Sequence, residues 1–101
     1  MKTGEKYFVR IDQKLSGDPV GKSVFDSHIE YVRRLAAETT LYAGGFKGVQ
    51  GGMLIFKAKN LVDADAMCKG DPIMAGGFYT YKLHEWSLLI TSESKKKMTE
   101  P

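Results

Sequence analysis

The order of its apolar segments limits the fold of this chain more than any other feature. Two segments repeat apolar side chains at helical spacing, residues 23–40 and the segment that follows Asn60. Four others are rich in aromatic and β-branched side chains, which favours strands: residues 7–11, 41–43, 53–58 and 79–88. The order strand, helix, strand, strand, helix, strand predicts a ferredoxin-like βαββαβ fold of the α+β class, with a four-stranded antiparallel sheet.

One face of this sheet is predicted to lack a cover within the chain. Right-handed connections place both helices on the same face. The other face is expected to carry apolar side chains such as Met53, Ile55, Phe8 or Trp86, since both sets of alternating residues in the third and fourth strands are substantially apolar. A second copy of the chain is the simplest cover. We therefore expect a homodimer whose sheets pack face to face.

Both helices carry capping signals and an apolar stripe. Ser23 is expected to cap the first helix, with Asp26 in the capping-box position. The inward stripe of this helix is predicted from helical spacing to be Phe25, Ile29, Val32 and Ala36. Asn60 is expected to cap the second helix, whose inward stripe is Leu61, Ala64, Met67 and Cys68.

Length and charge exclude several classes of protein. A chain of 101 residues fits one domain, which we expect over residues 1–90, followed by a flexible tail at 91–101. The net charge of +3 is too small and too dispersed to predict nucleic-acid binding. The longest apolar run, residues 53–56, is too short to cross a membrane. We expect neither partner.

The single cysteine, Cys68, permits no disulfide within the chain and fits a reducing compartment. The N-terminus also lacks the apolar stretch of a signal peptide. We therefore expect a cytoplasmic protein. Cys68 lies on the inward stripe of its helix, so a nucleophilic role is not expected. The sequence has no phosphate-loop, dinucleotide or metal-ligand pattern, and no cofactor is predicted.

Two polar residues far apart in the chain are predicted to meet. His28 precedes Val32 by one helical turn and should therefore face inward. Asp71 precedes a proline, which predicts an N-cap with Pro72 opening a short helical turn. The predicted topology brings the connections at residues 13–22, 44–52 and 70–77 to one end of the sheet. We expect a His28 ring nitrogen roughly 2.6–3.2 Å from an Asp71 carboxylate oxygen.

Each of these residues has a structural reading beside the functional one. His28 is either a general base or a partly buried side chain satisfied by a backbone group. Asp71 is a cap, a partner of the imidazole, or both, since its two oxygens can serve different donors. Gly44 and Gly45 either mark the close approach of a ligand or supply turn geometry. His84, in an alternating strand, is expected on the sheet surface.

Several short motifs, taken together, resemble the YCII-related family of small α+β proteins. They span residues 6–88 and comprise His28 early in its helix, Ala43-Gly44-Gly45-Phe46, Gly51-Gly52, Asp71-Pro72 with Ala75, Gly77 and Tyr79, and Trp86. The resemblance implies a dimeric α+β barrel and a His–Asp pair at His28 and Asp71. It also implies kinship with muconolactone-isomerase-like folds and with dehalogenating lyases of aromatic catabolism. Gly45 and Ile73 depart from the family pattern, where proline and an aromatic residue are common.

The resemblance and the residues together define a functional hypothesis. His28 would abstract a proton from a small cyclic or aromatic substrate, and Asp71 would orient it, in an isomerase or lyase without a cofactor. A pocket beside the pair should be walled by residues 13–22 and 44–46. The residues expected to bind substrate are Arg10, Gly44, Gly45, Phe46 and Pro72. A non-catalytic protein that binds a small ligand in the same pocket is the alternative.

Overall fold

The computed structural model describes residues 1–15, 17 and 19–92 and confirms the predicted α+β order. The elements are β1 (Lys6–Lys14), α1 (Lys22–Glu38), β2 (Leu41–Gly45), β3 (Gly51–Phe56), α2 (Leu61–Lys69), α3 (Pro72–Ala75) and β4 (Tyr79–Ser87). Within the described residues, the short helix α3 is the one addition to the predicted order, and it occupies the predicted turn at Pro72. Most of the predicted tail at 91–101 lies outside the described residues.

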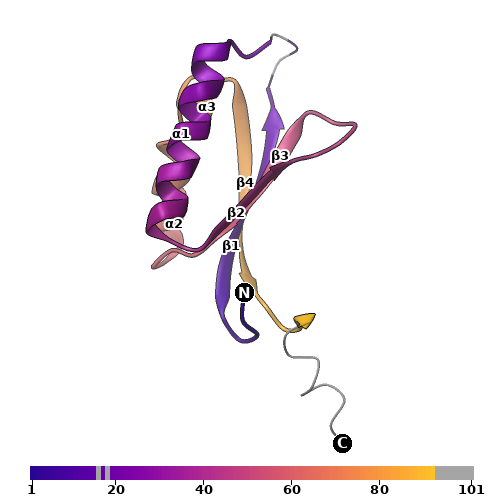
Figure 1. The fold of residues 1–101 in the computed structure, drawn as a ribbon, viewed down its shortest axis with the longest axis vertical. Helices are drawn as coiled ribbons and strands as arrows, with labels where there is room; N and C mark the ends of the chain where they lie inside the picture. Colours follow the sequence, from indigo (N-terminus) through magenta and orange to yellow (C-terminus); the bar gives the residue numbers. More distant parts are fainter. Residues whose placement is uncertain (16, 18, 93–101) are drawn as a thin grey trace, which may run out of the picture.

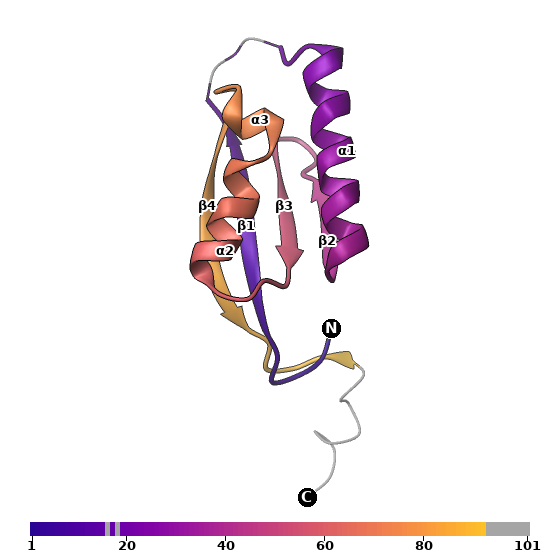
Figure 2. The same ribbon diagram turned by 90° about the vertical axis from the view of Figure 1, so that its left-hand side faces the viewer.

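The four strands form one antiparallel sheet in the order β2-β3-β1-β4, as a ferredoxin-like fold requires. The helices α1, α2 and α3 cover the same face of this sheet (Figure 1). Viewed from that face, α1 lies beside α2 and α3, which follow one another in line (Figure 2). The start of α1 and the helix α3 therefore lie at the same end of the sheet, as the topology predicted.

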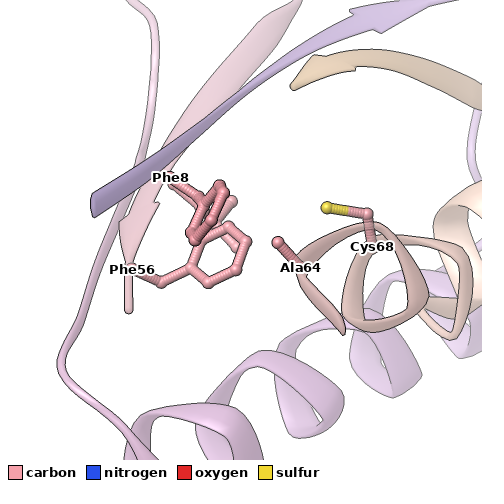
Figure 3. Packing of buried hydrophobic residues seen from close by; sticks show 5 residues of the cluster. Phe8, Phe56, Ala64 and Cys68 are labelled. Atoms are coloured by element: carbon pink, nitrogen blue, oxygen red, sulfur yellow. The ribbon is translucent and has the colours of Figure 1, made fainter. Parts of the chain in front are cut away.

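The hydrophobic core lies between this face and α2. Phe8 of β1 and Phe56 of β3 are opposite each other in the register, and their ring centroids are 6.1 Å apart. Ala64 and Cys68 of α2 point toward these rings (Figure 3). Burial raises the pKa of the Cys68 thiol to about 11, so the thiol stays protonated near neutral pH. The core position predicted for Cys68 is confirmed.

Of the two predicted helix caps, the one at Asn60 is confirmed and the one at Ser23 is wrong. Asn60 caps α2 as predicted, since its side-chain oxygen accepts a hydrogen bond of 2.8 Å from the backbone N–H of Asp63. The prediction for Ser23 is wrong, because α1 begins two residues earlier than a cap at Ser23 requires and has Gly21 at its N-cap. Ser23 therefore lies inside the helix, and Asp26 pairs with Lys22 at 2.7 Å instead of completing a capping box.

Parts of the predicted inward stripes are exposed. Phe25 is 49% exposed, Ala36 is also exposed, and no residue of α1 is fully buried. The first turns of α1, including Phe25, border a cavity at this end of the sheet instead of a filled core. In α2, Ala64 and Cys68 are buried as predicted, but Leu61 is 52% exposed in the first turn of the helix.

The sheet face opposite the helices carries a band of apolar side chains. The register places Val9 beside Ile55 on one side and His84 on the other, so these positions share a face. We define the open face as the apolar residues on this side: Val9, Ile11, Tyr42, Met53, Ile55 and Trp86. His84 is exposed there, as predicted. Phe8, which was expected among the side chains of the uncovered face, lies instead on the face covered by the helices, because it alternates with Val9 along β1. No helix in the described part of the chain is long and apolar enough to cross a membrane.

The start of β3 requires glycine. Gly51 has a φ of +149°, and a Cβ there would collide with the backbone carbonyl oxygen of Asp12 on β1. At Gly52 a Cβ would lie 2.6 Å from the backbone oxygen of Gly44. The absence of side chains at both positions allows β2, β3 and β1 to approach closely at the end of the sheet.

The substitution Gly51→Ala should lower the free energy of unfolding by about 1–3 kcal/mol, because it adds a strained backbone conformation and a collision with Asp12. The matched control is Gly44→Ala, where a Cβ would meet no atom within 4 Å. Urea unfolding of both variants measures the difference. Equal stability of the two variants would show that the close approach at Gly51 is unimportant.

Candidate active site

The candidate site is built around a buried arginine in the middle strand β1. Alternation along β1 places Phe8, Arg10 and Asp12 on the face covered by the helices. Arg10 is 0% exposed. Its Nε and Nη2 donate to the two carboxylate oxygens of Asp12 at 2.7 and 2.8 Å, and its Nη1 donates to Oδ2 of Asp71 at 3.0 Å. One guanidinium thus joins two carboxylates from distant parts of the chain.

Asp71 reaches this position because it caps the short helix α3. Its backbone is extended, and Pro72 occupies the first turn, as the sequence predicted. Oδ1 of Asp71 accepts a hydrogen bond of 3.1 Å from the backbone N–H of Ile73. The carboxylate is 0% exposed. The capping role is confirmed, and the same carboxylate also faces Arg10 and His28.

His28 lies in the second turn of α1 with its ring directed at Asp71. Its Nδ1 is 2.8 Å from both carboxylate oxygens of Asp71, within the range expected from the sequence. A carboxylate only accepts hydrogen bonds, so Nδ1 carries the hydrogen and Nε2 of the neutral ring keeps its lone pair. Among the described residues, no protein group bonds Nε2. The side chain is 14% exposed.

The surroundings of Asp71 favour its ionised form. Burial alone raises the pKa of a carboxyl group, but the hydrogen bonds from His28 and from the Ile73 N–H and the charge of Arg10 outweigh it. The pKa of Asp71 is therefore lowered. The carboxylate is retained as a stable acceptor for the His28 ring.

The pKa of Asp12 is shifted in the opposite direction from that of Asp71. Burial raises its pKa, and the hydrogen bonds and charge of Arg10 offset only part of this effect, while the charge of Asp71 adds to it. The pKa of Arg10 is raised, because its two carboxylate partners outweigh the opposing effect of burial. The cluster holds one positive and two negative groups, so its net charge is −1 when His28 is neutral.

A cavity of about 230 Å³ lies beside this cluster. Three polar side chains, from three different elements, face it: His28 of α1, Asp12 of β1 and Tyr79 of β4. Apolar side chains and glycines form the remaining lining: Phe25, Ile29, Val32, Ala43, Gly44, Gly45, Gly51, Gly52, Leu54 and Ile73. The cavity can hold a single ring and present polar groups to its substituents.

The residues expected to bind substrate occupy different places. Gly44 and Gly45 line the cavity, and neither has a positive φ, so they are not turn glycines. Arg10 lies beneath the lining with all of its bonds directed to Asp12 and Asp71. Phe46 and Pro72 are not among the described residues that line the cavity. The connection at 13–22 was also expected to wall the cavity, but its described residues do not line it; residues 16 and 18 of this connection are not among the described residues.

Asp12 and Tyr79 line the cavity, although neither was expected there from the sequence. A signal for Asp12 was present: Arg10 and Asp12 stand two apart in a strand and share the face of Phe8. Opposite charges on the buried face of a strand need each other as partners. Among the described residues, no group of three or more His, Cys, Asp and Glu side chains is arranged to hold a metal ion.

Comparison with known proteins identifies the family. The sequence model of the YCII-related domain matches residues 7–87, which is most of the chain. The chain belongs to the YCII-related family. The resemblance drawn from the short motifs is thereby confirmed. The match covers both His28 and Asp71.

A solved structure supports the fold of this YCII-related protein. The fold of this chain is similar to that of 5-chloro-2-hydroxyhydroquinone dehydrochlorinase (TftG) from Burkholderia phenoliruptrix AC1100, whose structure was solved in complex with 2,5-dihydroxybenzoquinone. The TM-score is 0.61 with 17% sequence identity, over 80% of this chain and 93% of the other. At this identity the likeness establishes the fold. The sequence has no match among curated proteins.

The substitution Asp71→Asn should lower the free energy of unfolding at pH 7 by about 3–5 kcal/mol, because it removes one partner of a buried ion pair. The pKa of Asp71 is lowered in the folded protein. The advantage of the wild type is therefore fully present above the unfolded pKa of about 3.9 and is lost as the pH falls through the lower folded value. Urea unfolding between pH 7 and pH 2 measures this dependence.

The matched control for this experiment is Asp26→Asn. Asp26 is 57% exposed and pairs with Lys22 across one turn of α1, so its loss should change stability by less than about 0.5 kcal/mol. If Asp71→Asn were as stable as this control at pH 7, the buried ion pair would have no structural importance.

Proposed function

We propose that this protein is an enzyme that abstracts a proton from a small cyclic or aromatic substrate, without a cofactor. The observation that carries the proposal is the hydrogen bond between His28 Nδ1 and the fully buried carboxylate of Asp71. This bond leaves Nε2 as the basic nitrogen of a side chain that lines the cavity. In such a pair the carboxylate orients the imidazole and stabilises the imidazolium that forms.

The reaction would proceed in two balanced steps. Nε2 of His28 takes a proton from an O–H or C–H group of the substrate, and the released electron pair forms a new double bond. In an isomerisation, the imidazolium then returns the proton to another atom of the substrate. In an elimination, formation of the new double bond is accompanied by cleavage of a bond to an anionic leaving group such as chloride, which departs with the bonding pair, and the imidazolium later gives its proton to solvent.

The cavity supports a ring-shaped substrate. Its volume of about 230 Å³ and its largely apolar lining suit one ring with a few polar substituents. The structural neighbour TftG is described as a dehydrochlorinase and is complexed with a substituted quinone. We extend this to the present chain as a proposal that the substrate is a hydroxylated ring, with or without a halogen substituent.

Replacing His28 with alanine should reduce turnover by about a hundred- to ten-thousandfold, the usual contribution of a general acid–base group. The matched control is His84→Ala, because His84 is exposed on the opposite face of the sheet. A set of hydroxylated and chlorinated single-ring compounds supplies the substrates, and release of chloride or a change in absorbance reports the reaction. Equal turnover by the two variants would contradict the proposal.

A non-catalytic ligand-binding protein is the second candidate. The observation in its favour is that three polar side chains face the cavity, and all three can recognise a ligand by hydrogen bonds alone. The two functions differ in one measurable respect. A binding protein would retain its ligand unchanged over hours at stoichiometric concentration, whereas an enzyme would convert it at a rate that depends on His28.

The homodimer expected from the sequence is also part of this proposal. The open face leaves large apolar side chains in contact with solvent, including Tyr42 at 52% and Trp86 at 38% exposure. Apolar patches of this kind usually mark an interface. A second copy related by a two-fold axis would cover the same residues on both chains. We also retain the cytoplasm as the proposed location, on the argument from Cys68.

The substitution Ile55→Arg should convert the proposed dimer to a monomer, because it places a charge at the centre of the open face. Light scattering at micromolar concentration measures the mass. The matched control is Val62→Arg, since Val62 is 77% exposed on α2, on the other side of the sheet. A wild-type protein that is monomeric under these conditions would exclude the dimer.

A further inference from the structure

We propose that Asp12 contacts the ligand and makes the cavity selective for rings that carry hydroxyl groups over rings that carry a carboxylate. The inference deepens the proposed function, because it assumes that the cavity beside His28 is the ligand site. It does not require that the bound ligand be converted. It assigns a recognition role to a residue that is separate from the His28 and Asp71 pair.

Asp12 has both the exposure and the free acceptor sites for this role. It retains 9% of its surface and lines the cavity, whereas Arg10 and Asp71 have no exposed surface. Each of its carboxylate oxygens accepts one hydrogen bond from Arg10. An ionised carboxylate has about four lone-pair sites, so two are left for donors on a ligand. A hydroxyl substituent is such a donor.

The cavity also lacks a cation that could receive a carboxylate ligand. No lysine or arginine occurs among the described residues that line it. Arg10, the nearest positive group, is fully buried and donates to Asp12 and Asp71. With His28 neutral, the cluster has a net charge of −1. A carboxylate on the ligand would therefore meet Asp12 without an available counter-charge, which is unfavourable.

Two hydroxyl groups on one ring could donate hydrogen bonds to both polar sides of the cavity, His28 and Asp12. One hydroxyl would donate to Nε2 of His28, and the other to a carboxylate oxygen of Asp12. These residues come from different elements, α1 and β1, so a ring between them would be held at two points. Tyr79 supplies a further polar group on β4. The ligand class that fits is a dihydroxylated single ring without an acidic substituent.

The test compares three ring compounds of similar size by isothermal titration calorimetry at pH 7, under nitrogen. Hydroquinone is neutral and has two hydroxyl donors. In 4-hydroxybenzoate one hydroxyl is replaced by a carboxylate, which is ionised at this pH. The compound 4-hydroxybenzamide has nearly the shape of 4-hydroxybenzoate but is neutral, so it separates charge from size.

We expect the wild type to bind hydroquinone and 4-hydroxybenzamide at least about tenfold more tightly than 4-hydroxybenzoate, because like charges are juxtaposed only in the last case. The variant Asp12→Asn should reduce this ratio to less than about threefold, since its amide can donate to a carboxylate. The surface variant Asp26→Asn should keep the wild-type ratio. The measurement on the wild type decides the inference even if Asp12→Asn fails to fold.

Three outcomes would overturn the inference: tighter binding of 4-hydroxybenzoate than of hydroxylated neutral rings, equally weak binding of the acid and its amide, or no binding of any of the three. An unchanged ratio in a folded Asp12→Asn variant would also overturn it. The binding test of Asp12 does not depend on whether the protein is an enzyme. Selective binding of hydroquinone without any turnover would contradict the enzyme and still support the role of Asp12.

Discussion

The ionic contacts of Arg10 are the interaction on which the rest of the site depends. A guanidinium with no exposed surface must have charged partners, and Arg10 has one on its own strand and one on α3. A buried ion pair of this kind adds little net stability relative to an apolar core, but removal of one partner is costly. The main effect of these ionic contacts is therefore geometric, because they hold the Asp71 carboxylate in a fixed position beside β1.

The fixed position of Asp71 in turn orients the imidazole ring of His28. The carboxylate of Asp71 is held by Arg10 and by the backbone of Ile73, and it presents both oxygens to His28 at 2.8 Å. α1 has no fully buried residue, and Val32 packs against the core while only partly buried. The contact with Asp71 adds a polar restraint one turn before Val32. The same arrangement leaves a cavity in place of a filled core at this end of the sheet.

The sequence predicted the fold and the meeting of His28 with Asp71 because both follow from local signals and topology. Proline after Asp71 marks a cap, and the βαββαβ order brings its helix beside the start of α1. The sequence did not reveal Asp12, because the predicted first strand ended at Ile11, whereas β1 continues to Lys14 and its alternation places Asp12 on the buried face of Arg10. Helix boundaries also depend on competing contacts, as the pairing of Lys22 with Asp26 shows.

The central claim is that Asp71 holds His28 with its hydrogen on Nδ1 and its lone pair on Nε2. Nitrogen-15 NMR of the histidine ring, at a pH where the ring is neutral, measures this tautomer directly. The account predicts the Nδ1–H form for His28 in the wild type, a loss of this preference in Asp71→Asn, and no such change at His84. A wild-type His28 that carries its hydrogen on Nε2 would contradict the account.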